Sequence, residues 1–109
     1  MVSYNVIISP KALSQLEEYI DYIQYTLFNN QGARAVWEDA LETANRLESV
    51  AGSLEPCSHP KLKEYGYYPI LFSRHRYVML YRIDGSTAYV DAVYHELQDY
   101  QDTFAKDLK

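Results

Sequence analysis

The side chains that could do chemistry in this chain are histidine, arginine and tyrosine groups in its second half. Cleavage of RNA without a metal needs a base for the 2′-hydroxyl, cations for the charge on the phosphorane and an acid for the leaving oxygen. His95 could titrate near neutral pH and serve as acid or base. Arg74 and Arg76 could hold the phosphate, and Tyr100 could shuttle a proton. These four residues are the candidate catalytic set.

A second group could bind the nucleic acid itself. Lys61, Lys63 and Arg82 could hold phosphate, and Tyr94 could stack on a base. Each candidate also has a purely structural interpretation. Loop lysines are commonly only solvated, and most of the twelve tyrosines should pack in a sheet with a wet hydroxyl. Arg82 could form a cross-strand ion pair with Asp91.

His95 carries the same ambiguity, because it could simply cap its strand or bond Asp99. Other chemistries lack their motifs. The three histidines are not at paired helical spacing, and Cys57 is the single cysteine, so no metal site is predicted. The chain has no glycine-rich phosphate loop and no nucleophile elbow. The sequence therefore predicts no metal and no cofactor.

Size and charge limit the possible roles further. A chain of 109 residues with 48% hydrophobic residues is typical of one globular domain, here residues 1–109. It contains no apolar run that could cross a membrane and no secretion signal, and we expect a cytoplasmic protein. The net charge is −5, yet residues 56–85 carry five basic side chains and only two acidic ones. A local basic patch could meet phosphate on an otherwise acidic protein.

The first half of the chain predicts a strand followed by two helices. Residues 3–9 are rich in β-formers, and Ser9-Pro10 is a typical helix start. Apolar residues then recur at helical spacing up to Leu27, and the segment 29–32 should end the helix. A second amphipathic helix is predicted from Ala33 to Ala51. The two helices should form an antiparallel hairpin whose facing stripes are core.

The second half predicts three strands after a loop at residues 52–63. The first begins at Tyr67, and the turn Asp84-Gly85 should join the second to the third. In the second strand, Tyr77, Met79, Tyr81 and Ile83 should share one face. In the third strand, residues 87–94, one face should carry Ala88, Val90, Ala92 and Tyr94. The other face should carry Tyr89, Asp91, Val93 and His95.

These elements predict an α+β fold. An N-terminal strand and a helical hairpin should pack on a small antiparallel β-sheet, and the tail from Leu97 should form a short C-terminal helix. The first strand must join the same sheet, at its edge.

The order and spacing of several motifs resemble the RelE/ParE superfamily of toxins from bacterial type II toxin–antitoxin pairs. The resemblance covers nearly the whole chain. It begins with YNVIISPKALSQLEEYIDYI and the helical hairpin, continues with HRYVMLYRIDG, and ends with VDAVYHELQDY. The motif positions in the last two segments are Tyr77, Tyr81, Asp84, Val93, His95 and Asp99.

The resemblance implies a toxin that a cognate antitoxin neutralises in a hetero-oligomeric complex. An exposed apolar stripe on the hairpin would be a groove for that antitoxin. RelE-like members cleave messenger RNA without a metal, commonly on the ribosome, and ParE-like members inhibit DNA gyrase. Our first hypothesis is therefore a metal-independent endoribonuclease, and the alternative is a non-catalytic inhibitor that binds DNA gyrase.

Departures from the RelE-like pattern keep that alternative open. RelE-like enzymes tend to have arginine directly after the first tyrosine of the central strand, where this chain has Val78. They often have lysines on the preceding strand, where Pro69 and Leu71 stand, and many have two arginines before the closing Asp, where Leu97 and Gln98 stand. A net negative charge is also unusual for a ribosome-directed nuclease, whose substrate is strongly anionic.

Overall fold

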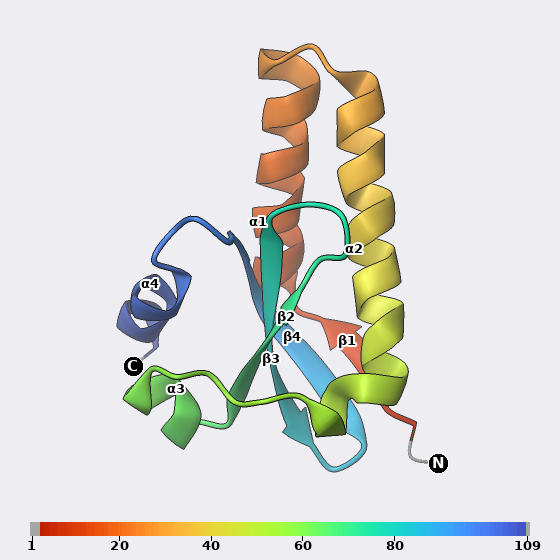
Figure 1. The fold of residues 1–109 in the computed structure, drawn as a ribbon. Helices are drawn as coiled ribbons and strands as arrows, with labels where there is room; N and C mark the ends of the chain where they lie inside the picture. Colours follow the sequence, from red (N-terminus) through yellow and green to blue (C-terminus); the bar gives the residue numbers. More distant parts are fainter. Residues whose placement is uncertain (1–2, 109) are drawn as a thin grey trace.

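A four-stranded sheet forms the centre of the molecule (Figure 1). The computed structural model describes residues 3–108. The strands are β1 (Asn5–Ile8), β2 (Tyr67–Leu71), β3 (Tyr77–Asp84) and β4 (Thr87–His95), in the spatial order β1-β4-β3-β2. This arrangement confirms the α+β fold and the edge position of the first strand. β1 runs parallel to β4, so the sheet is mixed, whereas β2, β3 and β4 pair antiparallel as predicted.

A long helical hairpin packs against the sheet and extends beyond it (Figure 1). Its first arm is α1 (Pro10–Asp21), whose N-cap is Ser9, with the Ser9 hydroxyl oxygen accepting from the Ala12 amide at 3.1 Å. A turn of π-helix, η1 (Tyr22–Thr26), continues this arm. The second arm is α2 (Asn30–Val50), which begins three residues earlier than predicted because Asn29 caps the Gly32 amide at 2.8 Å. The predicted hairpin is thus confirmed.

The loop predicted at residues 52–63 is partly helical. A turn of 3-10 helix, η2 (Ala51–Ser53), extends α2, and a short helix, α3 (Pro60–Glu64), begins at a proline. His59 caps α3, since its Nδ1 accepts from the Lys61 amide at 3.2 Å. The predicted C-terminal helix is α4 (Tyr100–Asp107), which lies beside α3 in Figure 1.

The hydrophobic core has two parts, one on each face of the sheet. The larger part fills the space between the sheet and the hairpin and includes Leu16, Val36, Leu47, Met79 and Tyr81. The smaller part lies under α3 and α4 and includes Leu62, Val78, Leu80, Tyr94 and Phe104. Both faces of β3 are therefore buried, as expected for a central strand.

An irregularity in β4 changes which residues face each part of the core. Leu80 pairs with Ala92 but Tyr81 pairs with Val90, so Asp91 has no partner on β3 and forms a β-bulge. Beyond the bulge the faces exchange, and Val93 joins Ala88 and Val90 under the hairpin. Ala92 and Tyr94 face α4 instead. The predicted faces of the last strand are thus wrong after Asp91.

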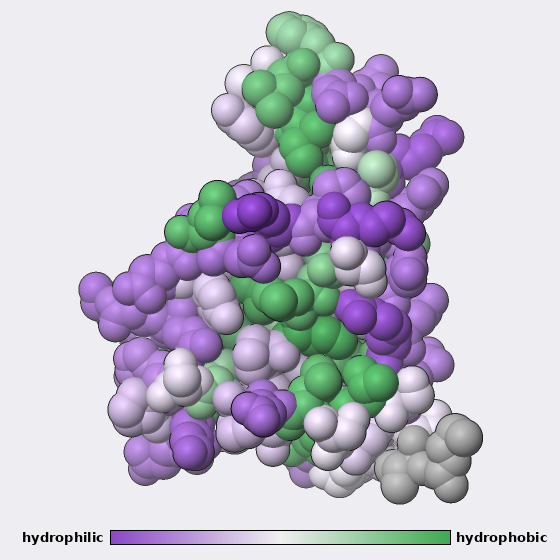
Figure 2. All heavy atoms as spheres, viewed as in Figure 1, coloured by the Kyte–Doolittle hydropathy of each residue, from purple (hydrophilic) through white to green (hydrophobic). Residues whose placement is uncertain are grey.

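Apolar side chains also remain on the surface. Figure 2 shows green surface gathered at the far end of the hairpin, in the same view as Figure 1. The exposed large side chains of this segment are Leu27 and Phe28, together with the aromatic Tyr22 and Tyr25, whose hydropathy is close to neutral. None of the helices in residues 3–108 is long and apolar enough to cross a membrane.

Candidate functional site

His95 is the last residue of β4 and is paired with Tyr77 at the start of β3. Its imidazole is partly buried, with its ring edge-on to the Tyr77 ring at a centroid distance of 5.2 Å. The Nδ1 atom accepts a hydrogen bond from the Leu97 amide at 3.1 Å. This bond favours the neutral tautomer with its proton on Nε2. His95 therefore does cap the end of its strand, and its Nε2–H is the group left for other partners.

The two arginines of the candidate catalytic set lie near His95. Both are in the β2–β3 turn, and the Arg76 carbonyl accepts from the Glu96 amide at 2.7 Å, which joins this turn to the end of β4. Both side chains are exposed. Arg74 forms an ion pair with Glu42 of α2, at 3.1 Å between Nη1 and Oε2. The structure thus brings His95, Arg74 and Arg76 to one end of the sheet, with Arg74 already paired.

The β2–β3 turn is held in place by Asp39, a residue that the sequence interpretation missed. Asp39 is completely buried on α2. Its carboxylate accepts from the amides of Ser73 and Arg74, at 3.1 and 2.9 Å, and lies 2.7 Å from Nδ1 of His75. Burial alone would raise the pKa of Asp39, but these hydrogen bonds outweigh it and hold the pKa below its ordinary value. Asp39 therefore fixes the turn that carries both arginines.

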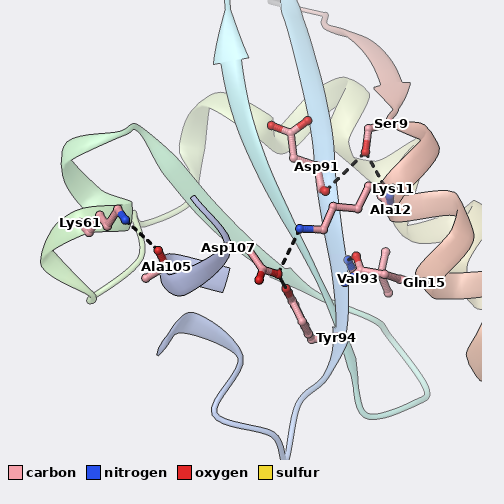
Figure 3. Close-up of polar contacts among 10 residues, drawn as sticks. All are labelled: Ser9, Lys11, Ala12, Gln15, Lys61, Asp91, Val93, Tyr94, Ala105 and Asp107. Carbon is pink, nitrogen blue, oxygen red and sulfur yellow. Dashed lines mark hydrogen bonds and ion pairs between the residues drawn. The ribbon is translucent and has the colours of Figure 1, made fainter. Parts of the chain in front are cut away.

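Lys61 has a structural partner rather than a free charge. Its Nζ donates to the carbonyl oxygens of Ala105 and Leu108, at 2.9 and 2.6 Å, as Figure 3 shows for Ala105. These carbonyls lie at the C-terminal end of α4, where unpaired carbonyl groups attract a cation. Lys63, two residues later, is exposed. The structure places Lys61 as the link between α3 and α4.

Arg82 lies far from His95 and forms the expected cross-strand ion pair. Its Nε is 2.9 Å from the carboxylate of Asp91, and its guanidinium lies over the Tyr89 ring. The Tyr67 hydroxyl donates to the same carboxylate at 2.7 Å. Burial, with the nearby Asp91 charge, raises the pKa of Tyr67 to about 12. Arg82 is five residues along β3 from the partner of His95, or about 17 Å.

The two remaining tyrosines of the predicted set also lie apart from the arginines. Tyr94 is buried against Phe104, and its hydroxyl lies 3.4 Å from Asp107, a contact drawn in Figure 3. Burial raises the pKa of Tyr94 above its ordinary value. Tyr100 lines a hollow of about 310 Å³ at the start of α4, together with His59, Asp99 and Asp102. The two carboxylates there would repel a phosphate.

Other groups with catalytic potential are buried or dispersed. Cys57 is almost completely buried, and burial raises the pKa of its thiol to about 11, so it is a poor nucleophile at neutral pH. Val78, which occupies the position of the RelE-like arginine, has no exposed surface and packs beneath α4. Within residues 3–108, no group of three or more acidic, histidine or cysteine side chains could hold a metal ion.

A comparison with protein-family models decides which family the chain belongs to. The model for the ParE toxin of the type II toxin–antitoxin system parDE matches residues 6–100. The chain belongs to this ParE toxin family. It is therefore a toxin of the RelE/ParE superfamily, as its motifs predicted. No significant match is found among curated proteins.

Solved structures agree on the fold of this ParE-family toxin. One chain of the chromosomal ParDE toxin–antitoxin system from P. aeruginosa superposes with a TM-score of 0.70 at 19% identity, covering 85% of this chain and 96% of that one. A chain of the RelBE2 toxin–antitoxin complex from Mycobacterium tuberculosis gives a TM-score of 0.59 at 22% identity, covering 90% and 97%. At these identities the likeness establishes the shared fold alone.

Proposed function

We propose that this toxin arrests growth by binding DNA gyrase and that it does not cleave RNA. The observation that carries the proposal is the dispersal of the residues predicted for RNA cleavage. Only His95, Arg74 and Arg76 share one end of the sheet, whereas Lys61 and Arg82 lie elsewhere with their charges engaged. The base must reach the 2′-hydroxyl and the acid the leaving oxygen of the same phosphodiester, each within hydrogen-bond distance.

The local electrostatics support the same proposal. The buried, apolar Val78 leaves no cation at the second position of β3, and the hollow beside Tyr100 is lined by two carboxylates. A metal-free nuclease depends on cations to stabilise charge that develops on the phosphate. Membership of the ParE family points to gyrase as the target, because ParE-like members of the superfamily inhibit it.

The second candidate function is the metal-independent endoribonuclease. One observation favours it: the exposed Arg74 and Arg76 and the partly buried His95 lie at the same end of the sheet. In this alternative His95 would be the acid or base, and the two arginines would hold the phosphate of messenger RNA.

We also infer that a cognate antitoxin binds this toxin, since both similar structures come from toxin–antitoxin complexes. Trp37 and Leu41, one turn apart on α2, are apolar and exposed, and they provide a surface for it. Amides around these residues should exchange more slowly with solvent when the antitoxin is bound. Unchanged exchange there would exclude this face as the groove.

The substitution His95→Ala separates the two functions in cells. We expect the variant to arrest growth as the wild type does, and primer extension on cellular messenger RNA to reveal no new cuts with either protein. The matched control is Tyr100→Phe, which removes only the hydroxyl of the other proposed proton carrier. Discrete cuts with the wild type that vanish with His95→Ala would establish the nuclease and overturn the proposal.

A further inference from the structure

The free end of the helical hairpin presents four large apolar side chains to solvent. This hairpin tip consists of Tyr22, Tyr25, Leu27 and Phe28, which are 55%, 66%, 55% and 87% exposed. A hollow of about 420 Å³ lies between the two helices and is lined by the apolar Ile20 and Trp37 and by polar side chains, among them Gln24 and Arg34. A contiguous exposed apolar patch on a soluble domain marks an interaction surface.

The backbone of the hairpin tip is held in an unfavourable conformation. Phe28 has φ 51°, in the left-handed region that a bulky side chain rarely adopts. The backbone is fixed on both sides of Phe28. The Leu27 amide donates to the Tyr22 carbonyl at 3.1 Å, and the Asn29 amide donates to the Ile23 carbonyl at 3.0 Å. The preceding π-helical turn is itself a local irregularity of a kind frequent at functional sites. The Phe28 side chain is exposed to solvent, so packing contacts within the toxin do not offset this strain.

The charges around the hairpin tip identify the chemistry of its partner. The flanking helical turns carry four exposed carboxylates and one exposed arginine, Arg34. The carboxylates are those of Glu17, Glu18, Asp21 and Glu38. This acidic collar would repel nucleic acid, and it would also repel a second copy of a chain whose net charge is −5. It is complementary to a protein surface with basic side chains.

We propose that the hairpin tip is the anchor by which this toxin binds its target protein. Phe28 and Tyr25 insert into an apolar pocket of the target, and the acidic collar meets basic residues on the pocket rim. The proposal rests on the proposed function, so the target is DNA gyrase. Buried aromatic anchors surrounded by complementary charge are the usual carriers of binding energy at protein interfaces.

The test uses purified toxin and purified bacterial DNA gyrase in a supercoiling assay. Phe28→Asn is the main variant. Asparagine tolerates the left-handed conformation, so this variant should fold as the wild type does. Tyr25→Ser is a second variant at an exposed helical position. The matched control is Leu71→Thr, which removes an exposed apolar side chain from the distant sheet edge at a residue suited to threonine. Circular dichroism verifies the fold of each variant.

We expect half-inhibition to need at least about tenfold more Phe28→Asn or Tyr25→Ser toxin than wild type, with Leu71→Thr unchanged. Asp21→Lys should weaken inhibition too, and added salt should weaken the wild type more than that variant. Equal inhibition by the wild type and both tip variants would overturn this inference and leave the proposed function intact. A folded wild type that leaves gyrase fully active would instead overturn the proposed function, and the target named here with it.

Discussion

Asp39 is the single residue on which the geometry of the arginine-bearing turn depends most. It lies on the buried stripe of α2 and accepts from two amides of the β2–β3 turn and from the His75 ring. A buried carboxylate is costly unless all its oxygens are paired. Here each oxygen has at least one donor, so Asp39 connects the hairpin to the sheet through a polar contact inside the core.

The variant Asp39→Asn should lose about 2 kcal/mol of unfolding free energy at pH 7. The neutral side-chain amide of asparagine has only one accepting oxygen and no charge, whereas both oxygens of the Asp39 carboxylate accept hydrogen bonds. The folded-state pKa of Asp39 lies below that of the unfolded chain, so its contribution is complete above about pH 5 and is lost as the pH falls below about 4. Denaturant titrations at pH 7 and pH 3 check this, with Glu38→Gln, at an exposed position of the same helix, as the control. A stability difference that stays constant between the two pH values would contradict it.

Sequence patterns identified the roles of some residues and missed those of others. Ser9 as an N-cap and Arg82 as the partner of Asp91 were predictable from local spacing and strand register, and both are confirmed. Asp39 lies three residues after Val36, on the apolar stripe of α2, but a carboxylate is rarely buried unless it is paired, so its type gave no reason to expect burial. The donors that bury it come from residues more than thirty positions later, which no local pattern reports.

At the scale of elements, α4 owes its position to side chains from several other elements. Phe104 packs edge-on to Tyr67 of β2, and Lys11 of α1 forms an exposed ion pair with Asp107, drawn in Figure 3. Lys61 of α3 bonds the last carbonyls of the helix. An eight-residue helix is marginal on its own, so these contacts decide whether it stays docked.

Replacing Lys61 with methionine should therefore loosen α4 without unfolding the core. The methionine keeps the apolar stem but removes the donors that pair the Ala105 and Leu108 carbonyls. Amide hydrogen exchange in residues 104–108 should become about tenfold faster or more, while exchange in β3 and β4 stays unchanged. Lys63→Met, an exposed position on the same helix, is the control and should have no effect. Equal protection of α4 in both variants would reject the role of Lys61.

The errors in predicting the elements have specific physical causes. The period of two in β4 holds up to Val90, and the bulge at Asp91 then moves every later side chain to the opposite face. An acidic residue between Val90 and Ala92 gives only a weak signal for such a bulge. The pairing direction of β1 was also not predictable, because a crossover through two helices allows either orientation at a sheet edge.

For the whole molecule, sequence patterns were sufficient for the fold and the family. The helical and strand periods, the Ser9-Pro10 start and the Asp84-Gly85 turn all agree with one another, and the ParE family match extends over residues 6–100. The candidate nuclease site was not predictable in this way. Its residues were chosen by type, and only the folded chain reveals that Lys61 and Tyr94 are engaged in structural contacts.

The central claim is that this toxin acts by binding gyrase, and a supercoiling assay tests it most directly. Purified toxin is titrated against purified bacterial gyrase and relaxed plasmid, with His95→Ala measured in parallel. Our account predicts saturable inhibition by both proteins at the same concentrations, because His95 has no catalytic part in it. Full gyrase activity at saturating folded toxin would contradict the account.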